Sequence, residues 1–150
     1  MRVVIQRVSE ASMNINNEVY SSIGLGLVVL AGFEAGDGEK VIDRLSSKIV
    51  NMRIFSDAEG KMNLSVLDVD GEIMAVSQFT LHASTRKGNR PSFTRAAPPS
   101  ISEPLYNTFV NRISQLLNKP VATGIFGADM KVALINDGPV TIVMDTEKPE

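Results

Sequence analysis

A polar run closes one of the most apolar segments of the chain. The segment Glu72-Ile73-Met74-Ala75-Val76 leads directly into Ser77-Gln78-Phe79-Thr80-Leu81. A strand that ends in this way presents hydroxyl groups, an amide and free main-chain N–H groups, and such strand ends are frequent active-site positions. The same residues are also ordinary at a strand terminus, where water satisfies them. Spacing alone therefore gives a candidate site and leaves both interpretations open.

Nucleophilic catalysis at this site would need a base. Ser77 or Thr80 would have to be activated by His82, the only histidine, with a carboxylate to orient the imidazole. If the strand continues through His82, Ser77 points to the opposite face; Thr80 shares the face of His82, but no acid lies nearby in sequence. The pattern therefore disfavours a catalytic triad. Because the sequence also has no cysteine and no zinc, paired-carboxylate or phosphate-loop motif, we expect neither a metal nor a cofactor.

Positive charge gathers in the segment that follows. Between Glu72 and Glu103 there is no acidic residue, and the stretch from Thr85 to Ser100 is rich in proline, which predicts a long ordered loop with a function. A phosphate-contacting patch and a solvated loop both fit this composition. The net charge of −2 argues against a generally basic nucleic-acid binder. The candidate phosphate contacts are Arg86, Lys87, Arg90 and Arg95.

The chain is predicted to form one domain over residues 1–150, a common size for a single hydrophobic core. Helical spacing predicts two helices, one capped by Asp37 and reaching Met52, the other capped by Ser102 and reaching Leu117. Alternating and short apolar runs predict strands, most of them in antiparallel hairpins, including one turned by Asp70-Gly71. The expected class is α+β, with a curved or doubled, barrel-like sheet of mostly antiparallel or mixed strands and both helices on one side. The expected strands are residues 3–15, 18–23, 26–32, 51–55, 63–67, 131–135 and 140–145, together with a strand from Glu72 that carries Ser77, Gln78 and Thr80 at its end.

No export or membrane signal is expected. The apolar N-terminal residues meet Gln6 and Arg7 at once, so they do not form a signal-peptide core. The longest apolar run, Ile23 to Phe33, is shorter than the roughly 20 residues that span a bilayer. The sequence therefore predicts a soluble, cytoplasmic protein.

Three further segments place the candidate site in a family. They are residues 60–66 (Gly-Lys-Met-Asn-Leu-Ser-Val), 124–130 (Gly-Ile-Phe-Gly-Ala-Asp-Met) and 136–141 (Asn-Asp-Gly-Pro-Val-Thr). Taken in order with the Ser-Gln-x-x-Leu run, they resemble the D-aminoacyl-tRNA deacylase family from Met1 to about Asp145. The resemblance implies a cofactor-free hydrolase that proofreads translation by releasing D-amino acids from tRNA, and glycine from non-cognate tRNA. It also implies a homodimer with its active site at the subunit interface.

The resemblance assigns catalysis to the polar run Ser77, Gln78, Phe79 and Thr80. It implies that the main-chain N–H groups of Phe79 and Thr80 face the scissile carbonyl and stabilise the oxyanion, while the neighbouring 2′-hydroxyl of the RNA helps to activate water. Attack by the Thr80 side chain is the competing account. We favour the backbone account because Thr80 has no visible general base in the sequence.

The resemblance also implies how chirality is selected. From sequence alone, Asp137-Gly138-Pro139 is a turn with a trans X-Pro bond. The resemblance implies instead a cis bond that reaches into the partner subunit's pocket, where the carbonyl oxygens of Gly138 and Pro139 bind the substrate ammonium and the motif excludes L-residues. Arg7 is implied to hold this motif, although a bulge in the first strand could turn its side chain outward. The implied pocket residues are Leu81, Phe126, Ala128, Met130, Asn136 and Thr141.

Two other functions fit parts of the sequence. A non-catalytic RNA-binding protein would use the loop from Arg86 to Arg95, and a small-molecule esterase would use Thr80. Incubation with D-aminoacyl-tRNA and with a free D-amino-acid ester separates the three hypotheses.

Overall fold

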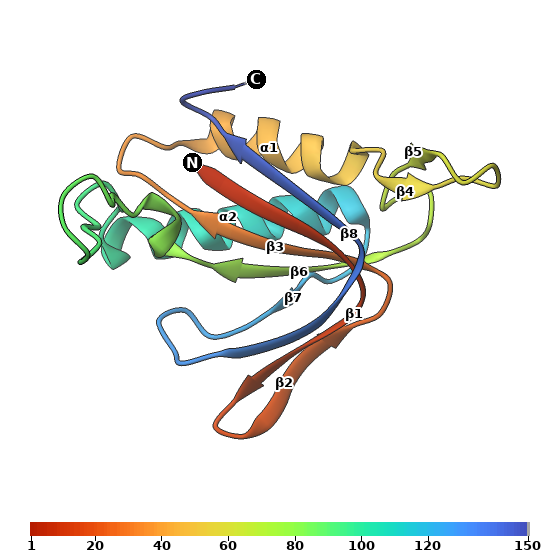
Figure 1. Cartoon of the computed structure of the whole chain (residues 1–150), viewed down its shortest axis with the longest axis horizontal. Coiled ribbons are helices and arrows are strands. Elements are labelled where there is room, and N and C mark those ends of the chain that lie inside the picture. Colours follow the sequence, from red (N-terminus) through yellow and green to blue (C-terminus); the bar gives the residue numbers. More distant parts are fainter. Residues whose placement is uncertain (150) are drawn as a thin grey trace.

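The first strand, β1 (Arg2–Ile15), organises the sheet because both of its edges are paired. One edge pairs with β3 (Gly26–Gly32) and then with β2 (Glu18–Ile23), while the other edge pairs with β8 (Lys131–Asp145) along nearly its whole length. The computed structural model, which describes residues 1–149, shows β1 and β8 curving together around the lower half of the sheet (Figure 1). The sheet is thereby nearly closed into a barrel-like shape.

The remaining strands make the sheet mixed. Its order is β2-β1-β3-β6-β7, and β6 (Glu72–Ser77) runs parallel to both β3 and β7 (Ala122–Thr123). A separate two-stranded sheet joins β4 (Phe55–Ser56) to β5 (Met62–Leu64). The hairpin predicted at Asp70-Gly71 is therefore wrong, because the chain leaves β5 and enters β6 beside β3. The α+β class with a mixed, barrel-like sheet is confirmed.

Two helices, α1 (Glu39–Asn51) and α2 (Pro99–Leu117), pack against each other and against one face of the sheet (Figure 1). Alternation along the strands explains this core, since every second side chain of β1, β3 and β6 points to the helices. The opposite parity forms a second apolar cluster inside the curve of the sheet, which includes Val28, Met74 and Val76. In the part of the chain that the structure describes, no helix is long and apolar enough to cross a membrane.

Both predicted helix caps are wrong. The N-cap of α1 is Gly38, and Asp37 instead accepts hydrogen bonds from the Met1 amino group and the Glu34 N–H, each at 2.7 Å. The second helix begins at Pro99, so Ser102 lies in its first turn and its hydroxyl donates to the Pro98 oxygen at 3.2 Å. Proline is favoured in a first helical turn because its missing N–H would have no acceptor there. The helix therefore starts earlier than the serine suggests.

The two last predicted strands are one continuous strand, β8. Asn136 pairs with Val8 and Thr141 pairs with Gln6, so both halves of β8 follow the same neighbour in the same direction. Only Arg7 separates those partners on β1, whereas residues 137–140 separate them on β8. The segment that reads as a turn is therefore a large bulge, which re-aims its residues without ending the pairing.

Candidate active site

The catalytic run predicted from the sequence lies where the sheet gives way to a single turn of 3-10 helix. Gln78 makes the last sheet-like bond, from its N–H to the Ala31 oxygen at 2.8 Å, and the helix η1 spans Phe79–His82. The first N–H groups of a helix have no acceptor within it. Within residues 1–149 the N–H groups of Phe79 and Thr80 accordingly have no hydrogen-bond partner. Two neighbouring donors are thus free to bind an oxygen atom.

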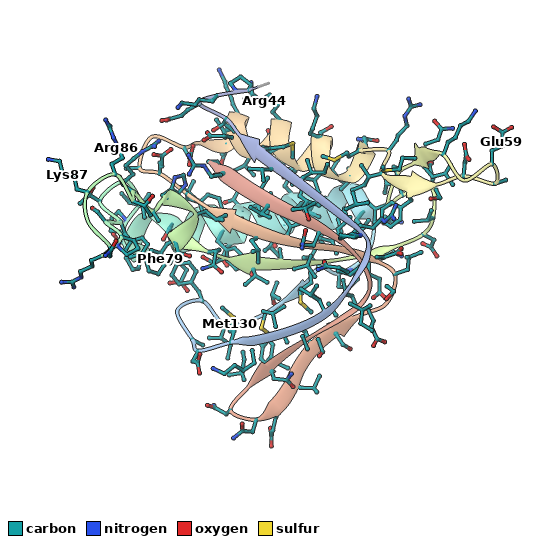
Figure 2. The ribbon with its side chains drawn as sticks, viewed as in Figure 1. Arg44, Glu59, Phe79, Arg86, Lys87 and Met130 are labelled. Atoms are coloured by element: carbon teal, nitrogen blue, oxygen red, sulfur yellow. The ribbon has the colours of Figure 1, made fainter. Side chains whose placement is uncertain are left out.

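A cavity of about 560 Å³ opens beside Phe79, whereas Thr80, the next residue, is exposed and is not part of its lining. Ser77, Gln78 and Phe79 form one wall, and Phe126 and Met130 come from the loop that precedes β8. In Figure 2, Phe79 points away from the ribbon near the end of β6, and Met130 lies where β8 begins. The lining is mostly apolar, which suits a site that excludes bulk water from a reacting carbonyl.

The structure adds a wall that the sequence prediction missed. Phe93 packs edge-on against Phe79, with ring centroids 5.2 Å apart and planes at 72°. Ala96, Ala97 and the start of α2 at Pro99 complete this side of the cavity. The available signal was an aromatic residue within a proline-rich loop, directly after Pro91-Ser92.

Thr80 is not set up as a nucleophile. Its Oγ1 accepts a hydrogen bond from Gln78 Nε2 at 2.5 Å, and an amide donor withdraws electron density from the oxygen. His82 is 2% exposed, and neither of its ring nitrogens has a hydrogen-bond partner in residues 1–149. The assumption that the strand continues to His82 is wrong, because in a 3-10 turn Thr80 and His82 point in different directions.

An acid does approach His82, from a segment distant in sequence. Glu34 Oε1 lies 3.8 Å from His82 Nδ1, and the same oxygen binds Arg95 Nη2 at 2.8 Å. Sequence spacing did not indicate this carboxylate, because it follows β3 rather than β6. Since His82 is buried and has no bond to Thr80, the contact belongs to the packing beneath η1.

Arg7 points into the molecule and finds the acceptors that its burial requires. The residue is only 9% exposed; Nε donates to the Asp137 main-chain oxygen at 2.9 Å, and Nη1 donates to the Ile54 main-chain oxygen at 2.7 Å. The Asp137 carboxylate lies 3.6 Å from Nε. A guanidinium offers several donors in a fixed plane, so one side chain fixes two main-chain segments. Arg7 thereby anchors the bulge of β8.

The bulge presents Gly138 and Pro139 at the surface, outside the cavity of its own chain. The Gly138-Pro139 peptide bond is cis, the geometry that the resemblance implies, and Gly138 has φ of 131°, a conformation that favours glycine. Asn136, beside the bulge, accepts a hydrogen bond from Gln6 Nε2 at 3.0 Å.

The predicted pocket residues divide into two groups. Phe126, Ala128 and Met130 line the cavity. Leu81, Asn136 and Thr141 do not: the Leu81 oxygen accepts a bond from Arg2 Nη1 at 2.6 Å, and the other two flank the bulge. A single chain therefore brings together only part of the expected site.

The basic loop is pinched at its base. Ser84 and Ser92 exchange main-chain hydrogen bonds of 2.8 and 3.0 Å, so residues 85–91 form a projecting tip. Figure 2 shows Arg86 and Lys87 extending from this tip into solvent, at the same end of the molecule as Phe79. Arg95 differs, because its guanidinium binds Glu34 at 2.9 Å and Glu147 at 2.7 Å. These carboxylates, Glu34 above all, raise the pKa of Arg95, and their negative charges balance its positive charge.

Comparison with known proteins supplies the family. A model of the D-Tyr-tRNA(Tyr) deacylase family matches residues 4–145. The chain belongs to this family. Two relatives named D-aminoacyl-tRNA deacylase, from Bacteroides thetaiotaomicron and Porphyromonas gingivalis, are 58% and 59% identical over 150 residues, with 100% of both chains covered. The expected enzyme class, a hydrolase of the deacylase type, is confirmed.

Solved structures resemble this deacylase along nearly its whole length. One, described as a c-Myc DNA unwinding element binding protein, has a TM-score of 0.92 and 40% identity, with 97% of this chain and 99% of that chain covered. Another, described as a probable eukaryotic D-amino acid tRNA deacylase, has a TM-score of 0.81, with 95% and 97% covered. At 19% identity, the second shows that the fold is shared.

Proposed function

We propose that this deacylase hydrolyses the ester that joins a D-amino acid to the terminal ribose of tRNA, and likewise glycine on a non-cognate tRNA. The observation that carries the proposal is the pair of neighbouring N–H groups of Phe79 and Thr80, which have no hydrogen-bond partner within residues 1–149, next to the aromatic cavity that Phe79 lines. Membership of the deacylase family and the names of the full-length relatives support the same substrate.

The two N–H groups supply the oxyanion site. When water attacks the ester carbonyl, negative charge develops on its oxygen, and fixed donors stabilise that charge; removing one such donor costs roughly 10²- to 10³-fold in kcat. The carbon–oxygen bond to the ribose then breaks, which releases the amino acid and the ribose hydroxyl. An aminoacyl ester is already activated, so positioning, water and two donors suffice without a covalent intermediate.

The base in this mechanism comes from the substrate. The ribose hydroxyl next to the ester lies within reach of the attacking water and helps to activate it. We prefer it to Asp129, a carboxylate that lines the cavity, because Asp129 is paired with Lys131 Nζ at 2.7 Å. Gln78 holds the Thr80 hydroxyl as an acceptor, so Thr80 acts through its N–H rather than through its oxygen.

The complete site requires a second copy of the chain. Gly138 and Pro139 are exposed and lie outside the cavity of their own chain, although their carbonyl oxygens are the proposed acceptors for the substrate ammonium. On the same strand, Ile135 is 54% and Val143 is 62% exposed, an unusual state for aliphatic side chains on both sides of one bulge. A homodimer would cover these side chains and place each bulge in the partner's cavity.

The test compares two substrates that share the ester and differ in the RNA. The enzyme is incubated with D-tyrosyl-tRNA and with D-tyrosine methyl ester, and release of free D-tyrosine is measured. Hydrolysis of the tRNA ester alone supports the proposal. Equal hydrolysis of both identifies a small-molecule esterase, and tRNA binding without release identifies a non-catalytic RNA-binding protein.

A further inference from the structure

Within residues 1–149, the lysine and arginine side chains without an ion pair fall mainly into two groups. Of the 15 Lys and Arg residues, seven form ion pairs with carboxylates within residues 1–149. Of the others, three are on the loop tip and one is Lys148. The remaining four lie on α1 or directly after it. They are Lys40, Arg44, Lys48 and Arg53, named here the α1 basic face.

The α1 basic face follows the solvent side of the helix. Lys40, Arg44 and Lys48 are four residues apart, so their side chains lie one above the other, opposite the buried residues of the helix. Asp43, on the flank, is held by Arg112 at 3.1 Å. At the helix end the surface is hollowed over about 510 Å³, and this hollow is lined by Arg44, Lys48 and Arg53 together with Ser47, Asn51 and Met52.

Stability of the helix does not explain this arrangement. Lys48, in the last turn, complements the negative end of the helix dipole, but Lys40 is the second helical residue, where a cation is unfavourable. Like charges four residues apart also destabilise a helix, by roughly 0.2–0.5 kcal/mol per pair. The α1 basic face therefore destabilises the helix. Its row of cations has the properties of a surface that binds a polyanion.

We infer that the α1 basic face binds phosphates of the tRNA body, away from the aminoacylated 3′ end. Figure 2 shows Arg44 on the upper edge of the molecule, well apart from Phe79, Arg86 and Lys87. A tRNA whose 3′ end enters the cavity has its duplex stem outside, with closely spaced phosphates that a row of cations can contact without reading sequence. The inference rests on the proposed function, because tRNA is taken as the substrate.

The decisive variant is Arg44→Glu/Lys48→Glu, with Lys61→Glu/Lys148→Glu as a control of equal net charge. Each is assayed on full-length D-tyrosyl-tRNA and on D-tyrosyl-adenosine, which lacks the stem. We expect the α1 variant to raise KM for the full tRNA about tenfold or more, with unchanged hydrolysis of the adenosine ester. Its salt dependence of tRNA binding should become shallower by about 1 to 2 in log–log slope.

The outcomes that overturn the inference are specific. An unchanged KM for the full tRNA removes the face from substrate binding, and an equal loss in the control variant assigns the effect to net charge. Loss of hydrolysis of the adenosine ester assigns it to damage of the fold. Binding of uncharged tRNA is measured in parallel, so the inference is decided even if the wild-type enzyme hydrolyses neither ester and the proposed function fails.

Discussion

The guanidinium of Arg7 holds the main chain of Asp137 through an Nε–oxygen hydrogen bond of 2.9 Å, where the register between β1 and β8 shifts between Gln6 and Val8. The second bond of Arg7, to the Ile54 oxygen, ties the same side chain to the entry of β4. A buried cation is tolerated only when its donors are satisfied, so the bulge and the arginine depend on each other. The position of Gly138 and Pro139 therefore follows from one side chain on a different strand.

Arg7→Lys should separate this positioning role from general stability. A single ammonium cannot reproduce both guanidinium bonds, and one buried carbonyl left without a donor costs roughly 1–3 kcal/mol. A misplaced bulge should also lower kcat/KM on D-aminoacyl-tRNA by about 10- to 100-fold and narrow the preference for D over L substrates. Arg112→Lys, which alters a surface ion pair with Asp43, is the control. An unchanged ratio of D to L hydrolysis in the folded variant would contradict the role.

Thr80→Ala should retain activity within about tenfold of wild type, because the main-chain N–H remains when the hydroxyl is lost. Removal of a true nucleophile would instead lower kcat by a factor of about 10⁴ or more. The measurement is single-turnover hydrolysis of D-tyrosyl-tRNA.

A tRNA that ends in 2′-deoxyadenosine tests the ribose hydroxyl in the same assay. It should be hydrolysed poorly by wild type and variant alike, and full activity on it would exclude assistance by the ribose.

Local patterns predicted the strands well and their partners less well. The strands 18–23 and 26–32 end where the sequence pattern ends them, because apolar runs and turn residues are local signals. The strand β6 ends at Ser77, earlier than the pattern predicts, because Phe79–His82 form a 3-10 turn. The parallel pairing of β3 with β6 has no such signal, since it depends on the helix α1 between them. Gly138-Pro139 has the composition of a turn, and only the neighbouring strand β1, which pairs on both sides of it, makes it a bulge.

In the candidate site too, the sequence revealed the residues that are contiguous and missed those that come from distant segments. The polar run after Val76 was visible because its chemistry is contiguous in sequence. Phe93 and Glu34 reach the site from two other loops, and no spacing rule connects them to Phe79 or His82. Arg7 could be singled out by its parity with Val3 and Ile5, but its acceptors are main-chain oxygens, which leave no trace in residue types.

Phosphate binding by the loop tip can be tested by comparing its cations with Arg95, which is already ion-paired. If Arg86, Lys87 and Arg90 contact phosphates, replacing each by Ala should make the log–log salt dependence of tRNA binding shallower by about 0.7 to 0.9. Arg95→Ala should change that slope little, because Glu34 and Glu147 already neutralise its charge. Equal changes in all four variants would show that the ion pairs of Arg95 open on binding. No change in any variant would remove the tip from the interface.

Asp145 should contribute to the decrease in the free energy of unfolding at acid pH. Burial opposes its charge most strongly, but the hydrogen bonds from Arg2 and from the Glu147 N–H outweigh this, so the pKa of Asp145 lies below its ordinary value. A carboxylate with a lowered folded pKa stabilises the protein above its unfolded pKa of about 4, and this contribution is lost as the pH falls further. Asp145→Asn should therefore lower the free energy of unfolding at pH 7 by about 1 kcal/mol and flatten its decline below pH 5. Denaturant titration at several pH values measures both, with the exposed Glu18→Gln as the control, which should leave the curve unchanged.

Handedness should depend on exclusion rather than on recognition of a side chain. With the ester carbonyl at the Phe79 and Thr80 donors and the ammonium at the Gly138 and Pro139 oxygens of the second copy, only two directions remain at the α-carbon. In this proposed dimer, a D side chain would leave the pocket, whereas an L side chain would be driven into the bulge. We expect D-alanyl-, D-tyrosyl- and glycyl-tRNA to be hydrolysed at rates within about tenfold of one another, and the L-forms at least about a hundredfold more slowly. Comparable rates on L- and D-tyrosyl-tRNA would refute this explanation.

A pair of glycine variants tests the bulge itself. Gly138 has φ of 131°, and an added Cβ would lie 3.0 Å from both Arg7 Nη2 and Val140 Cγ2, so Gly138→Ala must displace the bulge or its anchor. Gly60 also has a positive φ, of 79°, but a Cβ there meets nothing within 4 Å. Both variants place a side chain at positive φ, which costs of order 1–3 kcal/mol, and Gly138→Ala adds the crowding to a φ less favourable for a side chain than that of Gly60. We expect Gly138→Ala to lose D-aminoacyl-tRNA hydrolysis and Gly60→Ala to keep it, with thermal unfolding measured to show that both variants are folded; equal activity in the two variants would exclude the bulge from the active site.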